Sequence, residues 1–326
     1  FLDWIDGSLI KGQGFSPDEK QKFGMLYESG KGLQESFESH QSFDTYFKKL
    51  FHTGQHEKTN QGKKIINLYF TWEHLSKPSP KPIEHNDAFF WKQSIVDKRY
   101  DALIAGLLKP LADNKEPYCK VNFITWNYDL NLFMSLKNYF SPNSTIGDFF
   151  KQINKEHSWE IEGKITVVNM NGFFYNSYFS DLINLSRSTI YDIIYNKIKQ
   201  QDYFSKYELY ANKEHANDID DDAELLKFAW ETKNFNAKVA ESMIRESKNI
   251  IVIGYTFPLY NRSVDLKYFN GELLYGRRLV VQDPNVEEMK NDVIENFYLK
   301  PLQMRGQGIL CKANCDSFFI PNDIFN

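Results

Sequence analysis

The chain is poor in cysteine, in long apolar runs and in excess charge of either sign. Its 326 residues include 3 cysteines, too few for a disulfide framework or for a zinc site of four thiolates. It has no run of about eighteen apolar residues, which excludes a membrane-spanning helix. The net charge of −4 creates no basic field for nucleic acid. These absences predict a cytoplasmic protein that binds neither a membrane nor nucleic acid directly.

Residue types that bind metals occur in the chain, but their spacing is weak. Cys311 and Cys315 could bind a metal from one helical turn, form a disulfide, or have neither role. His52 and His56 have helical spacing, but a glycine between them weakens a helix and no acid follows His52. The acidic run 214–224 lacks the glycine and the spacing of a calcium loop, which favours a solvated loop. We therefore predict no metal site.

The most informative segment is an apolar strand that ends in polar side chains. Residues 121–126 form a short apolar run typical of a strand that is covered on both faces. Asn127 and Asp129 follow, and an apolar helical pattern then begins at Leu130, so Asp129 occupies an expected helix N-cap. Open α/β sheets bind their ligands at the carboxyl ends of parallel strands. The two side chains therefore indicate a ligand site or, alternatively, only the cap of a turn.

Three more apolar strands end in the same way. Residues 164–170 lead into Asn171 and Gly172, and residues 250–253 lead into Gly254. A glycine lets the backbone approach a ligand closely, and the next two residues offer backbone N–H groups and a hydroxyl. Residues 278–282 end at Asp283, and an acid there commonly accepts hydrogen bonds from ribose hydroxyls. The four strands predict a doubly wound, Rossmann-like α/β fold with a parallel sheet and a nucleotide site.

Helical patterns surround the predicted strands. We expect helical segments within 1–115, interrupted by the proline cluster 76–82, and a helical insertion at about 180–245 between two of the strands. The length fits one or two domains, and we predict a single α/β domain over 1–326.

Four of these motifs resemble those of the sirtuins and sirtuin-like NAD-consuming proteins, in the order in which that family has them. Residues 125–129 (Thr-Trp-Asn-Tyr-Asp) resemble the family's Thr-x-Asn-x-Asp element. Residues 170–172 (Met-Asn-Gly) lie where the family reads Leu-His-Gly, and residues 254–256 (Gly-Tyr-Thr) resemble its Gly-Thr-Ser turn. Residues 282–285 (Gln-Asp-Pro-Asn) follow the strand that faces the adenosine ribose. The resemblance covers roughly 118–290.

A longer pattern narrows the resemblance. The sequence from Val252 to Pro258, followed by Asn261, Arg262 and Asp265, is most similar to the sirtuin-like domains of bacterial anti-phage defence proteins. The resemblance implies a catalytic set and a set of NAD contacts. The catalytic residues are Asn127, Asp129 and Asn171, and the NAD-binding residues are Thr125, Trp126, Gly172, Gly254, Tyr255, Thr256, Asp283 and Asn285.

The chain departs from the family pattern in three ways. No Gly-Ala-Gly-x-Ser loop is present, and because the numbering begins at Phe1 we expect that loop and its strand to precede it; a cleaved secretory sequence before Phe1 is the alternative. Asn171 replaces the catalytic histidine, and an amide cannot act as a base near pH 7. The two Cys-x-x-Cys pairs of the zinc module are missing, so we expect NAD without zinc.

The resemblance implies an NAD glycohydrolase that cleaves NAD to nicotinamide and ADP-ribose and depletes it during anti-phage defence. The alternative is a catalytically silent module that binds NAD or ADP-ribose as a sensor or for assembly, and a surviving deacylase ranks third. For both the hydrolase and the silent module we expect NAD as the ligand. We also expect the protein to form a homo-oligomer or to bind a partner defence protein.

Overall fold

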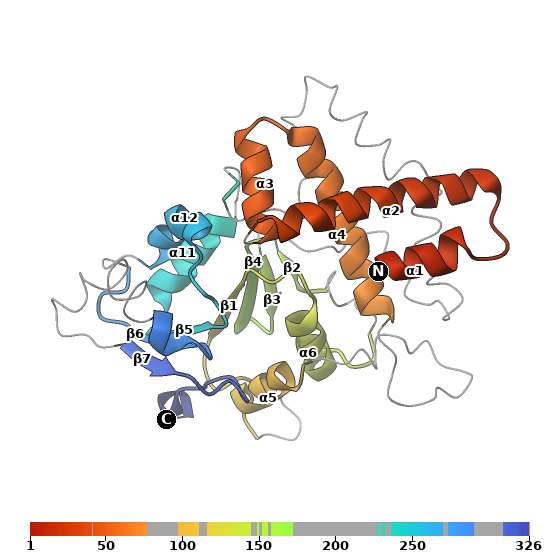
Figure 1. Cartoon of the computed structure of the whole chain (residues 1–326). Helices are drawn as coiled ribbons and strands as arrows, with labels where there is room; N and C mark the ends of the chain where they lie inside the picture. The colour runs from red at the N-terminus through yellow and green to blue at the C-terminus, as the bar shows by residue number, and fades with distance from the viewer. Residues whose placement is uncertain are drawn as a thin grey trace. The chain divides into compact units, whose positions relative to one another are not determined.

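The computed structural model describes most of the chain, and its contacts divide the chain into two compact units. One unit comprises Phe1–Ile95 and Gly172–Leu226, and the other comprises Val96–Asn171 and Lys227–Asn326. This division does not test the prediction of a single domain over 1–326, which stays a prediction. The described residues are 1–40, 42–76, 97–110, 116–144, 149, 152–155, 158–171, 226, 228, 230–231, 236–269, 273–289 and 309–325 (Figure 1). Gly172, the acidic run 214–224 and most of the expected insertion at about 180–245 lie outside these ranges.

The described part of the first unit is helical. It consists of α1 (Leu2–Trp4), the π-helical segment η1 (Ile5–Ile10), α2 (Pro17–Glu38), α3 (Phe43–His52) and α4 (His56–Ser76). Helix α2 begins with a capping box: the Ser16 hydroxyl accepts the Glu19 N–H, and the Glu19 carboxylate accepts the Ser16 N–H. Helix α2 has 22 residues and lies in the segment 1–115, where the sequence predicted helical segments.

An apolar core holds η1, α2 and α4 together. Helix α3 joins through Phe47, whose ring packs so closely on Gly62 of α4 that a Cβ there would lie 2.4 Å from it. Neither α2 nor α4, nor any other helix within the described ranges, is both long and apolar enough to cross a membrane. The buried members of this core are Ile5, Leu9, Phe23, Leu26, Ile65 and Leu68.

The second unit contains two small sheets. In the first, with strand order β1-β4-β3-β2, β1 (Val121–Thr125) runs parallel to β4 (Ile165–Asn169), and Thr125 pairs with Asn169. Strands β3 (Ser158–Ile161) and β2 (Asn154–Lys155) continue that sheet antiparallel. In the second sheet β5 (Asn249–Ile253), β6 (Arg278–Gln282) and β7 (Ile309–Lys312) are all parallel.

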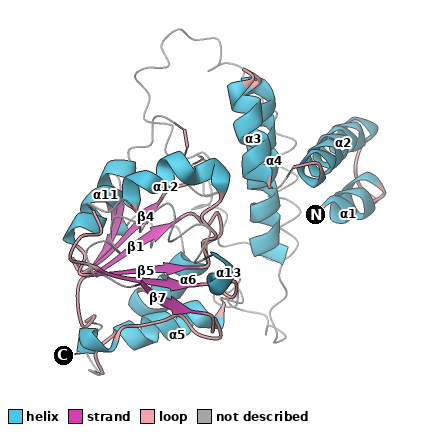
Figure 2. Cartoon of the chain, turned by 60° about the vertical axis from the view of Figure 1, so that its left-hand side comes forward, coloured by secondary structure: helices cyan, strands magenta, loops and turns pink. Residues whose placement is uncertain are grey.

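Helices lie on both sides of these strands. Figure 2 shows α11 (Asn236–Glu246) and α12 (Arg262–Tyr268) on one side, and α5 (Lys98–Leu107) and α6 (Asn131–Phe140) on the other. The remaining described elements of this unit are η4 (Leu259–Asn261), α13 (Val286–Met289) and η6 (Asn322–Phe325).

One apolar core serves both sheets. It combines residues of β4 and β5 with residues of α11 and α12, so the two sheets pack against the same helices. The second unit is therefore a mixed α/β structure with small parallel sheets, which confirms the predicted α/β class. Core residues from these elements include Val168, Val252, Val281, Ala240, Met243, Ile244, Val264 and Tyr268.

One local expectation needs correction, and one part of the first sheet was not expected. The sequence placed Asp129 at the N-cap of the next helix, but α6 begins at Asn131 and its N-cap is Leu130. Asp129 still helps to begin the helix, because its Oδ1 accepts the Asn131 N–H at 2.9 Å. The sequence predicted a parallel sheet and gave no sign of the antiparallel hairpin that β3 and β2 add to β4. These strands have 4 and 2 residues, too short for a recognisable alternating pattern.

Candidate functional site

The residues predicted from the sequence gather at the carboxyl ends of β1, β4, β5 and β6. Trp126 follows β1 and Tyr255 follows β5, and their rings stack with centroids 5.2 Å apart and planes inclined at 29°. Two strands of different sheets are thereby joined at the edge where ligands of α/β proteins bind. The indole N–H of Trp126 is buried and has no hydrogen-bond partner among the described residues.

Asn127 is exposed beyond the end of β1, and its side chain is oriented. Its backbone N–H donates to the Thr125 hydroxyl at 3.0 Å, and its Nδ2 donates to the Tyr100 hydroxyl at 2.9 Å. Because the amide nitrogen faces Tyr100, Oδ1 faces the other way, and within the described ranges it accepts no hydrogen bond. Asn127 therefore presents a hydrogen-bond acceptor to solvent.

Tyr100 of α5 is the site residue that sequence reasoning missed. Burial, together with the negative charge of nearby Asp129, raises the pKa of the Tyr100 hydroxyl to about 12. The phenol therefore keeps its proton at neutral pH. Its ring packs edge-on against Phe318, with centroids 4.9 Å apart, so the C-terminal segment helps to hold it. Nothing in the sequence near Tyr100 signals a site, because it is one of 19 tyrosines and lies far from the strand ends.

Asp129 completes this polar cluster. One carboxylate oxygen accepts the Asn131 N–H, and in the part of the chain that the structure describes no group donates to the other oxygen. The cluster of Tyr100, Asn127 and Asp129 thus combines a phenol, an amide oxygen and a carboxylate at the carboxyl end of β1. We call these three residues the β1 cluster.

Buried amides fasten the loop after β1 to the end of β4. Asn169 is fully buried; its Nδ2 donates to the Asn127 carbonyl at 3.2 Å, and its Oδ1 accepts the Asn171 N–H at 3.1 Å. Asn171 is 6 % exposed, and its Nδ2 donates to the Trp126 carbonyl at 2.7 Å. Asn236 of α11 donates to the Asn169 carbonyl at 2.6 Å. The side chain at the family's histidine position thus holds the backbone of the β1 loop. Its predicted catalytic role stays a prediction.

The turn after β5 offers two backbone donors. Gly254 has φ +62, a left-handed conformation that favours glycine, and its N–H already donates to the Gln282 carbonyl. The N–H groups of the next two residues, Tyr255 and Thr256, have no acceptor among the described residues. Thr256 is also exposed. Successive free amides of this kind suit an anion such as phosphate.

The Tyr255 side chain is locked beneath this turn. Its hydroxyl donates to Oδ1 of Asp265, which is fully buried, at 2.7 Å, and accepts from Asn261 Nδ2 at 3.2 Å. Burial and the Asp265 charge raise the pKa of Tyr255 far above its ordinary range. Asn261 and Asp265 belong to the pattern that begins at Val252 and resembles the defence proteins. In this structure the two residues hold the Tyr255 side chain through its hydroxyl.

The end of β6 is also tied to its surroundings. Asp283 is 4 % exposed, and its Oδ1 accepts the Asn285 N–H at 2.8 Å, the same turn that Asp129 makes after β1. Gln282 is buried, and its side chain holds the C-terminal segment through Asn314 and Phe319. Asn285 is exposed. The predicted ribose contacts of Asp283 and Asn285 stay predictions.

Metal-binding groups do not gather in the described ranges. Across those residues, no three His, Cys, Asp or Glu side chains lie close enough to hold a metal ion. Cys119, Cys311 and Cys315 are half-buried, and no disulfide joins any of them to another described cysteine. His52 lies at the end of α3 and His56 at the start of α4, and both rings contact Phe51 edge-on.

Comparisons of this chain with protein-family models, with curated proteins and with solved structures found no match. The sirtuin-like resemblance therefore rests on the motifs of residues 118–290.

Proposed function

We propose that the second unit is a sirtuin-like NAD glycohydrolase, which cleaves NAD to nicotinamide and ADP-ribose and depletes cytoplasmic NAD during anti-phage defence. The observation that carries this proposal is the β1 cluster. It sets an amide oxygen, a carboxylate and a protonated phenol together beside the amide-lined turn after β5.

The proposal includes a doubly wound, Rossmann-like arrangement. Strands β1 and β5 lie next to each other in both views, and helices lie on both sides of the strands (Figures 1 and 2). Together with the shared core, this supports regarding the two sheets as halves of one wound sheet. The β1 cluster and the β5 turn then stand at the crevice where such folds bind dinucleotides.

In this proposal, different residues contact the diphosphate and the two riboses of NAD. The N–H groups of Tyr255 and Thr256, beside Gly254, suit the diphosphate because neither is used within the described part of the protein. Asp283 and Asn285, at the end of β6, take the adenosine ribose. Thr125 and Trp126 border the nicotinamide ribose. The resemblance also assigns Gly172 to NAD, and that residue lies outside the described residues.

Hydrolysis breaks the bond between the nicotinamide nitrogen and the ribose carbon and joins that carbon to a water oxygen. Nicotinamide leaves as a neutral molecule, because its ring nitrogen is positively charged in NAD, so the leaving group needs no proton. The water loses one proton, for which Asp129 is the acceptor. Asn127 Oδ1 and the Tyr100 hydroxyl orient the water or the ribose, and the Asp129 charge stabilises the oxocarbenium-like transition state.

Nicotinamide release tests this proposal. The full chain is incubated with NAD, alone and with phage lysate or nucleic acid as trigger, and the products are separated by chromatography. Nicotinamide and ADP-ribose in equal amounts are expected. Acetyl-ADP-ribose formed only with an acetyl-lysine peptide would indicate a deacylase instead, and intact NAD in every mixture would contradict hydrolysis.

A second candidate is a module that binds NAD or ADP-ribose without chemistry and acts through a homo-oligomer or a partner defence protein. One observation favours this module. Asn171, which stands where the family has its catalytic histidine, donates its side-chain N–H to the Trp126 carbonyl. Calorimetric titration separates the two candidates. Saturable binding of NAD without nicotinamide release, with or without trigger, supports the module, whereas turnover excludes it.

A further inference from the structure

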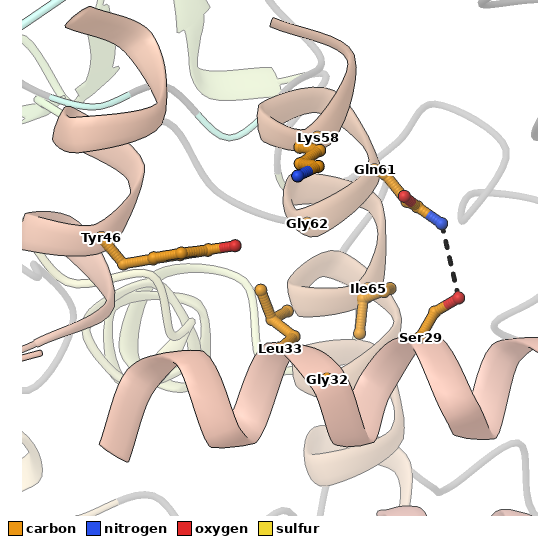
Figure 3. Close-up of a pocket in the computed structure, with 8 residues that line it drawn as sticks. All are labelled: Ser29, Gly32, Leu33, Tyr46, Lys58, Gln61, Gly62 and Ile65. Carbon is orange, nitrogen blue, oxygen red and sulfur yellow. Dashed lines mark hydrogen bonds between the residues drawn. The ribbon is translucent and has the colours of Figure 1, made fainter. Parts of the chain in front are cut away.

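The helical unit contains a pocket of about 160 Å³ where α2, α3 and α4 meet. A cavity of about 150 Å³ is large enough for a benzene-sized molecule. Leu33 of α2 and Ile65 of α4 form its apolar floor, and Tyr46 of α3 reaches across it towards α4 (Figure 3). Polar groups stand at the rim, where Gln61 donates to the Ser29 hydroxyl at 3.4 Å.

Two rim groups have unused hydrogen-bonding capacity. The Tyr46 hydroxyl has no hydrogen-bond partner among the described residues, although its ring packs against Phe37 and Phe47. Lys58 points towards the same side of the pocket (Figure 3), and no described carboxylate pairs with it. It also lies in the first turn of α4, where the helix dipole already favours negative charge. A cation and a phenol therefore converge without an anion between them.

One of the residues that line the pocket is a glycine that packing does not require. Gly32 lies inside α2, where glycine is less stable than alanine by roughly 0.5–1 kcal/mol. Packing does not require it, since a Cβ at Gly32 would meet nothing within 4 Å. Gly62, which also lines the pocket, differs, because a Cβ there would lie 2.4 Å from the Phe47 ring. Packing therefore requires glycine at Gly62 but not at Gly32.

We propose that this pocket binds a small monocarboxylate with a compact apolar body, such as an aromatic acid. The apolar part lies on Leu33 and Ile65. The carboxylate accepts hydrogen bonds from Lys58 Nζ and the Tyr46 hydroxyl, because a charged donor and a neutral donor together match a carboxylate's two oxygens. This site belongs to the helical unit and is separate from the β1 cluster.

Benzoate is the probe, and benzyl alcohol is its neutral counterpart. Binding to the full chain is measured by calorimetry and by saturation-transfer NMR. Benzoate is expected to bind about tenfold more tightly than benzyl alcohol, the usual advantage of a charge-assisted hydrogen bond. Lys58→Gln should remove that difference, whereas Lys20→Gln on α2, outside the pocket, should keep it.

Gly32→Leu should abolish binding by filling the pocket. The matched control is Gly24→Leu on the same helix, because a Cβ there also meets nothing within 4 Å and Gly24 does not line the pocket. Both variants are checked for an unchanged circular dichroism spectrum, so that a loss in only one of them reports on the pocket. No benzoate binding at millimolar concentration, equal binding by Gly32→Leu and Gly24→Leu, or equal affinity for acid and alcohol would each overturn the proposal.

Discussion

At the scale of single residues, one hydrogen bond decides which atom Asn127 offers to a substrate. With Nδ2 bound to the Tyr100 hydroxyl, the side chain cannot turn its nitrogen outward without losing that bond. Tyr100 is itself fixed by Phe318 and by burial in α5. Tyr100 is therefore a positioning residue for Asn127, whose Nδ2 its hydroxyl accepts.

Tyr100→Phe should lower the rate of NAD hydrolysis about tenfold, because one hydrogen bond that orients Asn127 is lost while the ring remains. Nicotinamide release at saturating NAD gives kcat. The control is Tyr139→Phe, which also removes one hydroxyl hydrogen bond, to the Asp101 carbonyl at 3.3 Å. Equal rates in both variants would show that Tyr100 does not position Asn127.

The Tyr100 hydroxyl also predicts a pH dependence. Its pKa is about 12 in the folded protein against an ordinary value of 10.0, so the folded protein keeps the proton longer than the unfolded chain. The associated stability is fully present below pH 10 and is lost as the pH rises through 12. The difference in alkaline ultraviolet absorbance between wild type and Tyr100→Phe should show one tyrosine that ionises near pH 12. A difference step near pH 10 would contradict this environment.

Tyr255→Phe should destabilise the protein by about 1.5–3 kcal/mol, the usual worth of a hydrogen bond to a charged group. The variant removes the hydroxyl that donates to the buried Asp265 carboxylate. Urea unfolding gives the free energy. Tyr118→Phe serves as control, since its hydroxyl has no partner among the described residues, and it should change stability by no more than about 0.5 kcal/mol. Similar values for both variants would mean that the Asp265 bond contributes nothing.

At the scale of secondary-structure elements, the contact between α3 and α4 depends on the absence of a side chain. Gly62→Ala would place a Cβ 2.4 Å from the Phe47 ring, so we expect a destabilisation of about 1–3 kcal/mol although alanine favours helix. Gly24→Ala, which meets nothing within 4 Å, should instead stabilise by about 0.5–1 kcal/mol. Urea unfolding of the two variants measures both signs. A stabilised Gly62→Ala would contradict the packing of these helices.

The strands that the sequence predicted are those rich in apolar residues. Strands β1, β4, β5 and β6 occupy the expected segments, and at least three of the five residues in each are Val, Ile, Leu or Phe. Strand β7, Ile309–Lys312, was not predicted, since 4 residues give too short a pattern. It is placed by pairing with β6 and by the side chain of Gln282, which are long-range contacts.

The candidate site was predicted in part for the same reason. Strand ends can be recognised locally, so Asn127, Asp129 and Gly254 were found from the sequence. The partners that fix them come from distant parts of the chain: Tyr100 from α5, Asn236 from α11 and Phe318 from the C-terminal segment. No local pattern shows that a given tyrosine or asparagine will pack at a strand end.

At the scale of the whole molecule, the two units divide the proposed roles. The β1 cluster, the β5 turn and the end of β6 all belong to the second unit, whereas the monocarboxylate pocket belongs to the helical unit. The three residues of the β1 cluster therefore all belong to the second unit. Of these three, Asn127 is the residue whose replacement tests the proposed hydrolysis most directly.

The most direct test compares nicotinamide release from NAD by wild type, Asn127→Ala and Asn143→Ala. Asn143 is an exposed asparagine in the turn after α6, so its variant controls for the loss of a surface amide. Asn127→Ala is expected to lower turnover about a hundredfold with an unchanged circular dichroism spectrum, whereas Asn143→Ala is expected to leave turnover unchanged. Turnover by Asn127→Ala equal to that of wild type would contradict the assignment of the β1 cluster as the catalytic site.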